Sequence, residues 1–238
     1  MDTNTGKSYY YVDYAAQKIR IICLNQYDTD DSDVNKRTKT AHYSQTQIDW
    51  FINTLKDATT NGYAVIVVYH SCNEVGFPTY NDSGFCQDRQ YAMFPSPTSG
   101  TIISDIIDAF QNASTLDETY TASDISVTLT VDTSFTAKGT FICYICGHEH
   151  IDYVGYSTKY PRQLICIAQG GVVLSESRGE AEAHWQSMYD TPRVANTSTH
   201  DSFNVYGFDT VNRLVKIAKI GSTLTDKFVP RSFATFRY

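Results

Sequence analysis

The sequence predicts an α/β fold in a single domain that spans residues 1–238. Two apolar runs, 63–69 and 140–146, lack the polar alternation of a half-exposed strand, and such runs are typical of strands covered on both faces of a sheet. Directly before the first run, residues 44–62 have the periodicity of an amphipathic helix. A chain of 238 residues is long enough to bury one large core.

The first part of the chain is predicted to form two strands and this helix. Aromatic and β-branched residues dominate 9–14 and 19–24, with a short turn between them. Ser44, followed three residues later by Gln47, has the pattern of a capping box at a helix start. The helix is expected to end at Gly62. Its apolar stripe comprises Ile48, Phe51, Ile52 and Leu55.

The rest of the chain is predicted to contain one more helix and several strands, joined by two long loops. The second helix is expected over residues 99–112, and the loops over 71–100 and 175–200. The strands are expected at residues 125–131, 140–146, 151–156, 164–168, 203–208 and 214–220.

Composition and charge exclude some classes of partner. The formal net charge of −7 argues against nucleic acid, because binding phosphates requires a basic face. No apolar run is long enough to span a membrane. The first residues are polar and resemble no signal peptide, so we expect a cytoplasmic protein. The acidic stretch 28–33 lacks the glycine and final glutamate of a calcium loop, and we expect a solvated loop there.

Six cysteines are present, and the sequence favours reduced thiols. Cys23, Cys143, Cys146 and Cys166 lie in apolar strand-like runs, where thiols behave as small buried hydrophobes. Cys143 and Cys146 have the spacing of a redox or zinc motif. Residues three apart in a strand point to opposite faces, however, so we expect the two sulfurs to diverge.

Three of the six histidines occupy positions that suit a metal site. His70 follows the apolar run 63–69 directly, and the pair His148 and His150 follows the run 140–146. The carboxyl ends of parallel strands form the ligand-binding edge of an open α/β sheet, so these imidazoles can converge there. Neutral imidazole is a common ligand of transition metals. We expect the other histidines, His42, His184 and His200, to be solvent-exposed.

These motifs resemble those of the calcineurin-like metallophosphoesterase family. Val67-Val68-Tyr69-His70-Ser71 is similar to the family's lone-histidine motif, and Gly147-His148-Glu149-His150 to its GHxH motif. The resemblance implies a layered α/β/β/α sandwich that cleaves small phosphate mono- or diesters. It implies two divalent ions (Mn, Fe, Zn or Ni), bridged by an aspartate and a hydroxide. His70 and His148 would bind the second ion, and His150 the first.

Three other motifs of that family are absent from the sequence. It contains no Asp-x-His triplet, no Gly-Asp and no Asn-His, so the bridging aspartate has no counterpart. We therefore expect a fold that is incomplete on its N-terminal side and that binds at most one ion, weakly. The chain would be a phosphoesterase domain fragment that is inactive alone. The alternative is a non-catalytic binding or assembly module on a degenerate scaffold of the same type.

An incomplete sheet would also expose an unpaired edge and apolar surface. Exposed sheet edges are templates for pairing with another chain. We therefore expect a homo-oligomer formed through the sheet edge or an apolar surface.

Overall fold

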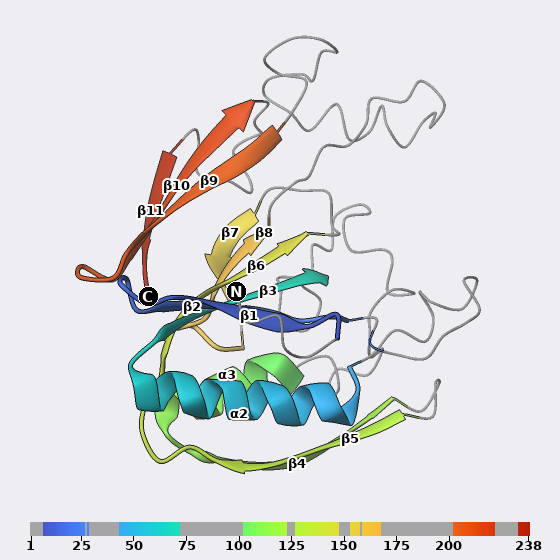
Figure 1. Ribbon diagram of the computed structural model, residues 1–238. Helices are drawn as coiled ribbons and strands as arrows, with labels where there is room; N and C mark the ends of the chain where they lie inside the picture. Colours follow the sequence, from blue (N-terminus) through green and yellow to red (C-terminus); the bar gives the residue numbers. More distant parts are fainter. Residues whose placement is uncertain are drawn as a thin grey trace, which may run out of the picture.

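A computed structural model describes residues 7–26, 28, 43–71, 102–122, 127–147, 153–157, 159–167, 202–221 and 233–238 (Figure 1). The helices are α2 (Gln45–Asn61) and α3 (Ile102–Asn112). The strands are β1 (Tyr10–Tyr14), β2 (Ile19–Cys23), β3 (Ala64–Ser71), β4 (Thr115–Ala122), β5 (Val127–Ser134), β6 (Thr140–Gly147), β7 (Tyr153–Tyr156), β8 (Leu164–Ile167), β9 (Ser202–Asp209), β10 (Leu214–Gly221) and β11 (Phe233–Arg237). The sequence patterns predict each of these except β4 and β11.

The central sheet has six strands in the order β1-β2-β3-β6-β8-β7. Neighbouring strands from β2 to β8 run parallel, while β1 and β7 pair antiparallel at the two edges. The predicted α/β class is therefore confirmed, with a mixed sheet at its centre. All four parallel strands end on the same side of the molecule, at the right in Figure 1.

Two helices cover one face of this sheet, and a second sheet covers the other (Figure 1). One apolar cluster joins the sheet to α2 and α3, and includes Phe51, Leu55 and Phe110. A second cluster lies toward the three-stranded sheet β11-β10-β9 and includes Val215 and Ile217. We expected four layers in the order α/β/β/α. The described residues contain the first three, namely the helices, the central sheet and the small sheet. They contain no helix on the far side of the small sheet.

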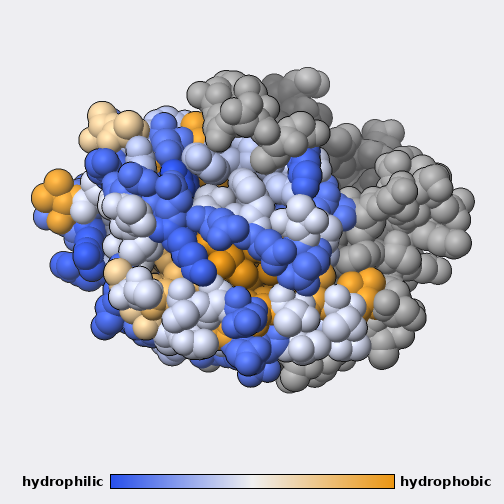
Figure 2. Space-filling view, turned by 60° about the horizontal axis from the view of Figure 1, so that its bottom comes forward, coloured by the Kyte–Doolittle hydropathy of each residue, from blue (hydrophilic) through white to orange (hydrophobic). Residues whose placement is uncertain are grey.

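The two-stranded sheet β4–β5 forms an additional layer outside the helices (Figure 1). Along β5, buried and exposed residues alternate, as expected of a sheet with one face on the core and one face in water. The space-filling view with this side turned forward is mostly blue and white, so its surface is largely polar (Figure 2).

Helix α2 has the boundaries predicted for it, but its start differs in detail. Ser44 is the N-cap, and its hydroxyl accepts a hydrogen bond from the backbone N–H of Gln47. The Gln47 side chain does not complete the capping box: it binds both backbone groups of Asn25, at 2.8 and 2.9 Å. Gly62 ends the helix in the left-handed region, with φ of 69°. Gln47 thus ties the helix start to the chain that leaves β2.

Candidate functional site

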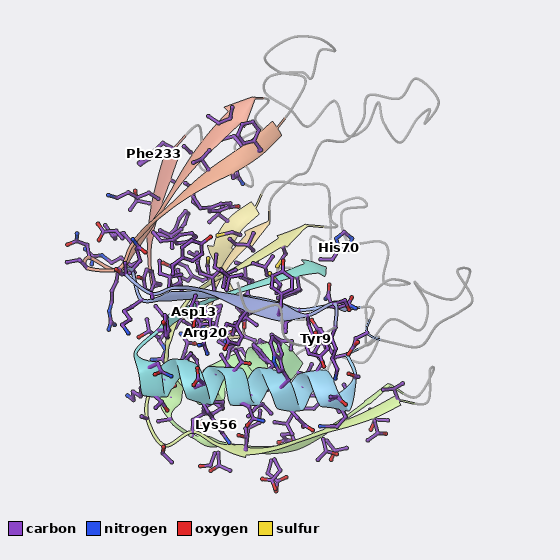
Figure 3. All side chains as sticks on the ribbon, in the orientation of Figure 1. Tyr9, Asp13, Arg20, Lys56, His70 and Phe233 are labelled. Carbon is purple, nitrogen blue, oxygen red and sulfur yellow. The ribbon has the colours of Figure 1, made fainter. Side chains whose placement is uncertain are left out.

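The carboxyl ends of β3 and β6 form the edge at which the sequence predicts a metal site. The two strands pair in parallel over their whole length, from Ala64 opposite Thr140 to Ser71 opposite Gly147. The register shifts at His70, so β3 has an extra residue there. Irregularities of this kind re-aim a side chain and recur beside active sites. Figure 3 shows His70 at the end of β3, on the side away from the helices.

The His70 imidazole lies beside the last residue of β6. A Cβ atom placed on Gly147 would lie 3.9 Å from Nδ1 of His70 and 3.7 Å from its carbonyl oxygen. These are ordinary van der Waals separations, so the imidazole ring lies beside the backbone of β6 without requiring glycine at that position. His70 is exposed. His148 is bonded to Gly147, so two of the three predicted ligands start from neighbouring strand ends.

A buried hydrogen-bond chain stiffens the strands behind this edge. The hydroxyl of Tyr144 donates to Gln163 at 2.7 Å, and the Gln163 amide donates to the carbonyl of Ser104 at 2.9 Å. Tyr144 and Gln163 are fully buried. The chain links β6 and the start of β8 to α3, and therefore fixes the strand that leads to Gly147.

The edge also carries a polar network at the end of β2. The carboxylate of Asp28 accepts hydrogen bonds from the Ser44 hydroxyl and from Gln47 Nε2, the latter at 3.3 Å. Asp28 belongs to the acidic stretch for which we expected a solvated loop. Its carboxylate instead binds the start of α2, where a negative charge is favourable. Residues 29–33 of that stretch lie outside the described residues.

The cysteines at this edge depart from the sequence prediction. Cys143 and Cys146 pack in different apolar clusters on opposite faces of the sheet, as expected. Cys146, however, forms a disulfide, whereas Cys23, Cys143 and Cys166 are free. Burial raises the pKa of the Cys143 thiol, and its contact with Cys166 raises that pKa further. Cys143 is therefore an unreactive core thiol. Cys146 forms a covalent cross-link one residue before Gly147.

A further cluster of titratable groups lies at α3 and is structural. The Asp105 carboxylate accepts hydrogen bonds from Tyr120 and Tyr160 and pairs with Lys159 at 2.7 Å. Burial and the negative charge of Asp105 raise the pKa of both tyrosines. These contacts hold β4 and the segment before β8 against α3, and they occupy the carboxylate.

The described residues contain only part of the predicted metal site. His70 is at the predicted strand end, while His148 and His150, like His42, His184 and His200, lie outside the described residues. Within the described ranges, no three side chains of His, Cys, Asp or Glu come together as metal ligands.

No helix in those ranges is both long and apolar enough to cross a membrane. Sequence reasoning missed the register shift at His70 and the disulfide of Cys146.

The comparisons with known proteins give likenesses in structure but none in sequence. No protein-family model matches the sequence, and no curated protein matches it. The crystal structure of a dimetal phosphatase from Danio rerio matches with a TM-score of 0.52 and 11% sequence identity. The match covers 97% of this chain and 60% of that chain. At this identity the likeness shows the fold alone, and this chain spans about three fifths of the length of that protein.

Proposed function

We propose that this chain is part of a metal-dependent phosphoesterase with a fold of the calcineurin-like type. The observation that carries the proposal is the position of His70 at a register shift between β3 and β6. Its Nδ1 lies 3.9 Å from where a Cβ atom on Gly147 would be. This is the edge at which open α/β sheets bind ligands. The likeness to a dimetal phosphatase supports the same fold.

His70, His148 and His150 would hold a divalent ion at this edge. Three imidazoles suit a transition metal such as Zn, Ni, Fe or Mn, and a water molecule would complete the coordination. A bound ion of this kind supplies a Lewis acid and lowers the pKa of its water. His70 would orient its ring over Gly147, and the hydrogen-bond chain behind β6 would keep the strand ends in register.

The donor set fits one ion better than two. Two cations held close together repel each other strongly, and a bridging carboxylate is needed to offset that repulsion. The sequence contains none of the three carboxylate- or asparagine-bearing motifs expected for a dinuclear centre. We therefore infer at most one weakly bound ion and no turnover of phosphate esters by this chain alone.

Metal titration of protein purified without nickel resin tests the ligand assignment. We expect one equivalent of Zn²⁺ or Mn²⁺ to bind by calorimetry, and His70→Ala to weaken binding by about tenfold or more. His200→Ala is the matched control and should leave the affinity unchanged. Absence of any bound ion, or equal affinities of the two variants, would contradict the proposal.

An activity assay tests the inference that the chain is not a complete enzyme. With bis-p-nitrophenyl phosphate and excess Mn²⁺, we expect no hydrolysis above the buffer rate. Metal-dependent turnover that is lost in His148→Ala would show instead that the chain holds a complete centre. If neither binding nor turnover is found, the alternative of a non-catalytic binding module is favoured.

A further inference from the structure

A basic cavity lies at the opposite end of the sheet from His70. It has a volume of about 530 Å³ and adjoins a second cavity of about 420 Å³, with which it shares Lys138, Gly139, Thr140, Arg213 and Tyr238. Thr140 begins β6, whereas Gly147 ends it. At a rise of about 3.3 Å per residue, the two ends of β6 lie about 23 Å apart. The two sites are therefore separate.

Four cationic side chains border the larger cavity, and none of its lining residues is acidic. The four are Lys138, Arg162, Arg213 and Arg237. Within the described part of the chain, none of them pairs with a carboxylate, whereas Arg20, Lys159 and Lys216 all do. The chain as a whole carries a net charge of −7. Unpaired positive charge is thus concentrated at one cavity of an otherwise acidic protein.

The backbone around the cavity is fixed by hydrogen bonds between several elements. The N–H of Tyr238 donates to the carbonyl of Arg213 at 3.2 Å, and the hydroxyl of Tyr156 donates to the carbonyl of Arg237 at 2.8 Å. The Arg162 guanidinium donates to the side chain of Asn112. These contacts place cations from the β9–β10 turn, β11 and the segment before β8 around one space. The β9–β10 turn and the C-terminus lie at the left in Figure 1.

Two of the basic residues adopt a strained backbone conformation. Arg213 has φ of 55° and Lys18, which borders the adjoining cavity, has φ of 53°. The left-handed region is unfavourable for a non-glycine residue. The turn before Arg213 is held by Asp209, which accepts two hydrogen bonds from Asn212 at 2.9 Å. Conformations of this kind persist only where the surrounding structure fixes them.

We propose that the larger cavity binds a small molecule that carries a chain of two or three phosphate groups. Guanidinium groups match phosphate oxygens in geometry and charge, and an anion between them relieves their mutual repulsion. The volume is in the usual range for small-molecule sites. Tyr156 and Tyr238 line the same cavity and offer aromatic contact to a nucleotide base. The proposal does not depend on the phosphoesterase activity.

Titration with inorganic triphosphate tests the site. EDTA in the buffer prevents binding through a metal ion, and affinity is measured by calorimetry on the full chain. We expect binding that weakens when salt is raised from about 50 to 200 mM. Arg213→Glu and Arg162→Glu, which lie on different elements, should each weaken binding by about tenfold or more. Both side chains are exposed, so the variants should fold, as circular dichroism can verify.

Two control variants locate the binding. Lys56→Glu makes the same charge change on α2, outside the lining of either cavity. His70→Ala removes the candidate metal ligand. Both variants should bind triphosphate like the wild type. ATP that binds as tightly as triphosphate, or more tightly, would support the site and show whether a base adds affinity. The proposal is overturned if triphosphate does not bind, or if Lys56→Glu weakens binding as much as Arg213→Glu.

Discussion

Arg20 shows how a single buried cation joins three elements. Its guanidinium makes a two-pronged contact with Asp13 on β1, at 2.7 and 2.9 Å, and donates to the carbonyl of Thr54 on α2 at 2.9 Å. Asp57 of the same helix lies at 2.8 Å, and the Tyr11 ring centroid at 4.0 Å. Burial lowers the pKa of Arg20, but the bonds to the two carboxylates outweigh it and raise that pKa. Figure 3 shows Arg20 between the sheet and α2.

We expect Arg20→Met to lower the free energy of unfolding by about 2 kcal/mol. Breaking a buried ion pair typically costs about 3–5 kcal/mol. The cost should be smaller here because Asp13 and Asp57 are 26% and 51% exposed and stay hydrated without the cation. Urea denaturation measures the change, with Lys56→Met as an exposed control. A loss below about 0.5 kcal/mol, the range of ordinary surface changes, would contradict the role of Arg20.

At the scale of elements, the sequence predicts the helices and strands whose boundaries depend on residues within or beside them. The boundaries of α2 follow from Ser44 and Gly62, which satisfy the backbone at the two helix ends. β4 has no such signal, because Asp117 and Glu118 are poor strand formers. It is held by pairing with β5 and by the bond from Tyr120 to Asp105 on α3. β11 likewise pairs with β10 alone. Each is a strand because it pairs with its neighbour in the sequence, not because of a pattern in its own residues.

The turn between β5 and β6 gives a test of element packing. The N–H of Gly139 donates to the carbonyl of Phe110 at 2.9 Å, and a Cβ atom on Gly139 would lie 2.0 Å from the Phe110 ring. Phe110 is fully buried in α3, so its ring cannot move aside freely. We expect Gly139→Ala to destabilise the fold by about 1–3 kcal/mol through overpacking, measured by urea denaturation.

Gly62→Ala is the matched comparison for that variant. A Cβ atom on Gly62 meets nothing within 4 Å, but its φ of 69° is unfavourable for alanine. The expected loss is about 1 kcal/mol, from the backbone alone. If Gly139→Ala is no more destabilising than an exposed surface change, the close contact between the β5–β6 turn and α3 is refuted.

At the scale of the whole molecule, the sequence predicts that the strand ends of β3 and β6 meet, but it does not predict how. The basis in the sequence is two buried apolar runs, one followed by His70 and the other by Gly147 and His148. The shift at His70 and the disulfide of Cys146 depend on contacts between segments distant in the chain, which no local pattern encodes.

The self-association expected from the sequence requires an exposed apolar surface, and the small sheet has one. Phe203, Val205, Ile220 and Phe233 are four of the eight large hydrophobic side chains that are exposed in the described ranges. In the register of the small sheet, Ile220 lies opposite Phe203, and Ala218 lies opposite both Val205 and Phe233. They therefore share the outer face of β11-β10-β9, where Figure 3 shows Phe233. Two copies that pair through this face would remove it from water in both.

We propose that this face forms the contact in a homodimer. Val205→Asp and Phe233→Asp should each shift the species seen by light scattering from dimer toward monomer, because an interface cannot bury an unpaired carboxylate cheaply. Val211→Asp is the control, since Val211 is 89% exposed in the β9–β10 turn and lies outside the face. A wild-type chain that is monomeric at all concentrations would refute the prediction. A dimer that tolerates both carboxylates would place the contact elsewhere, at an edge such as β1.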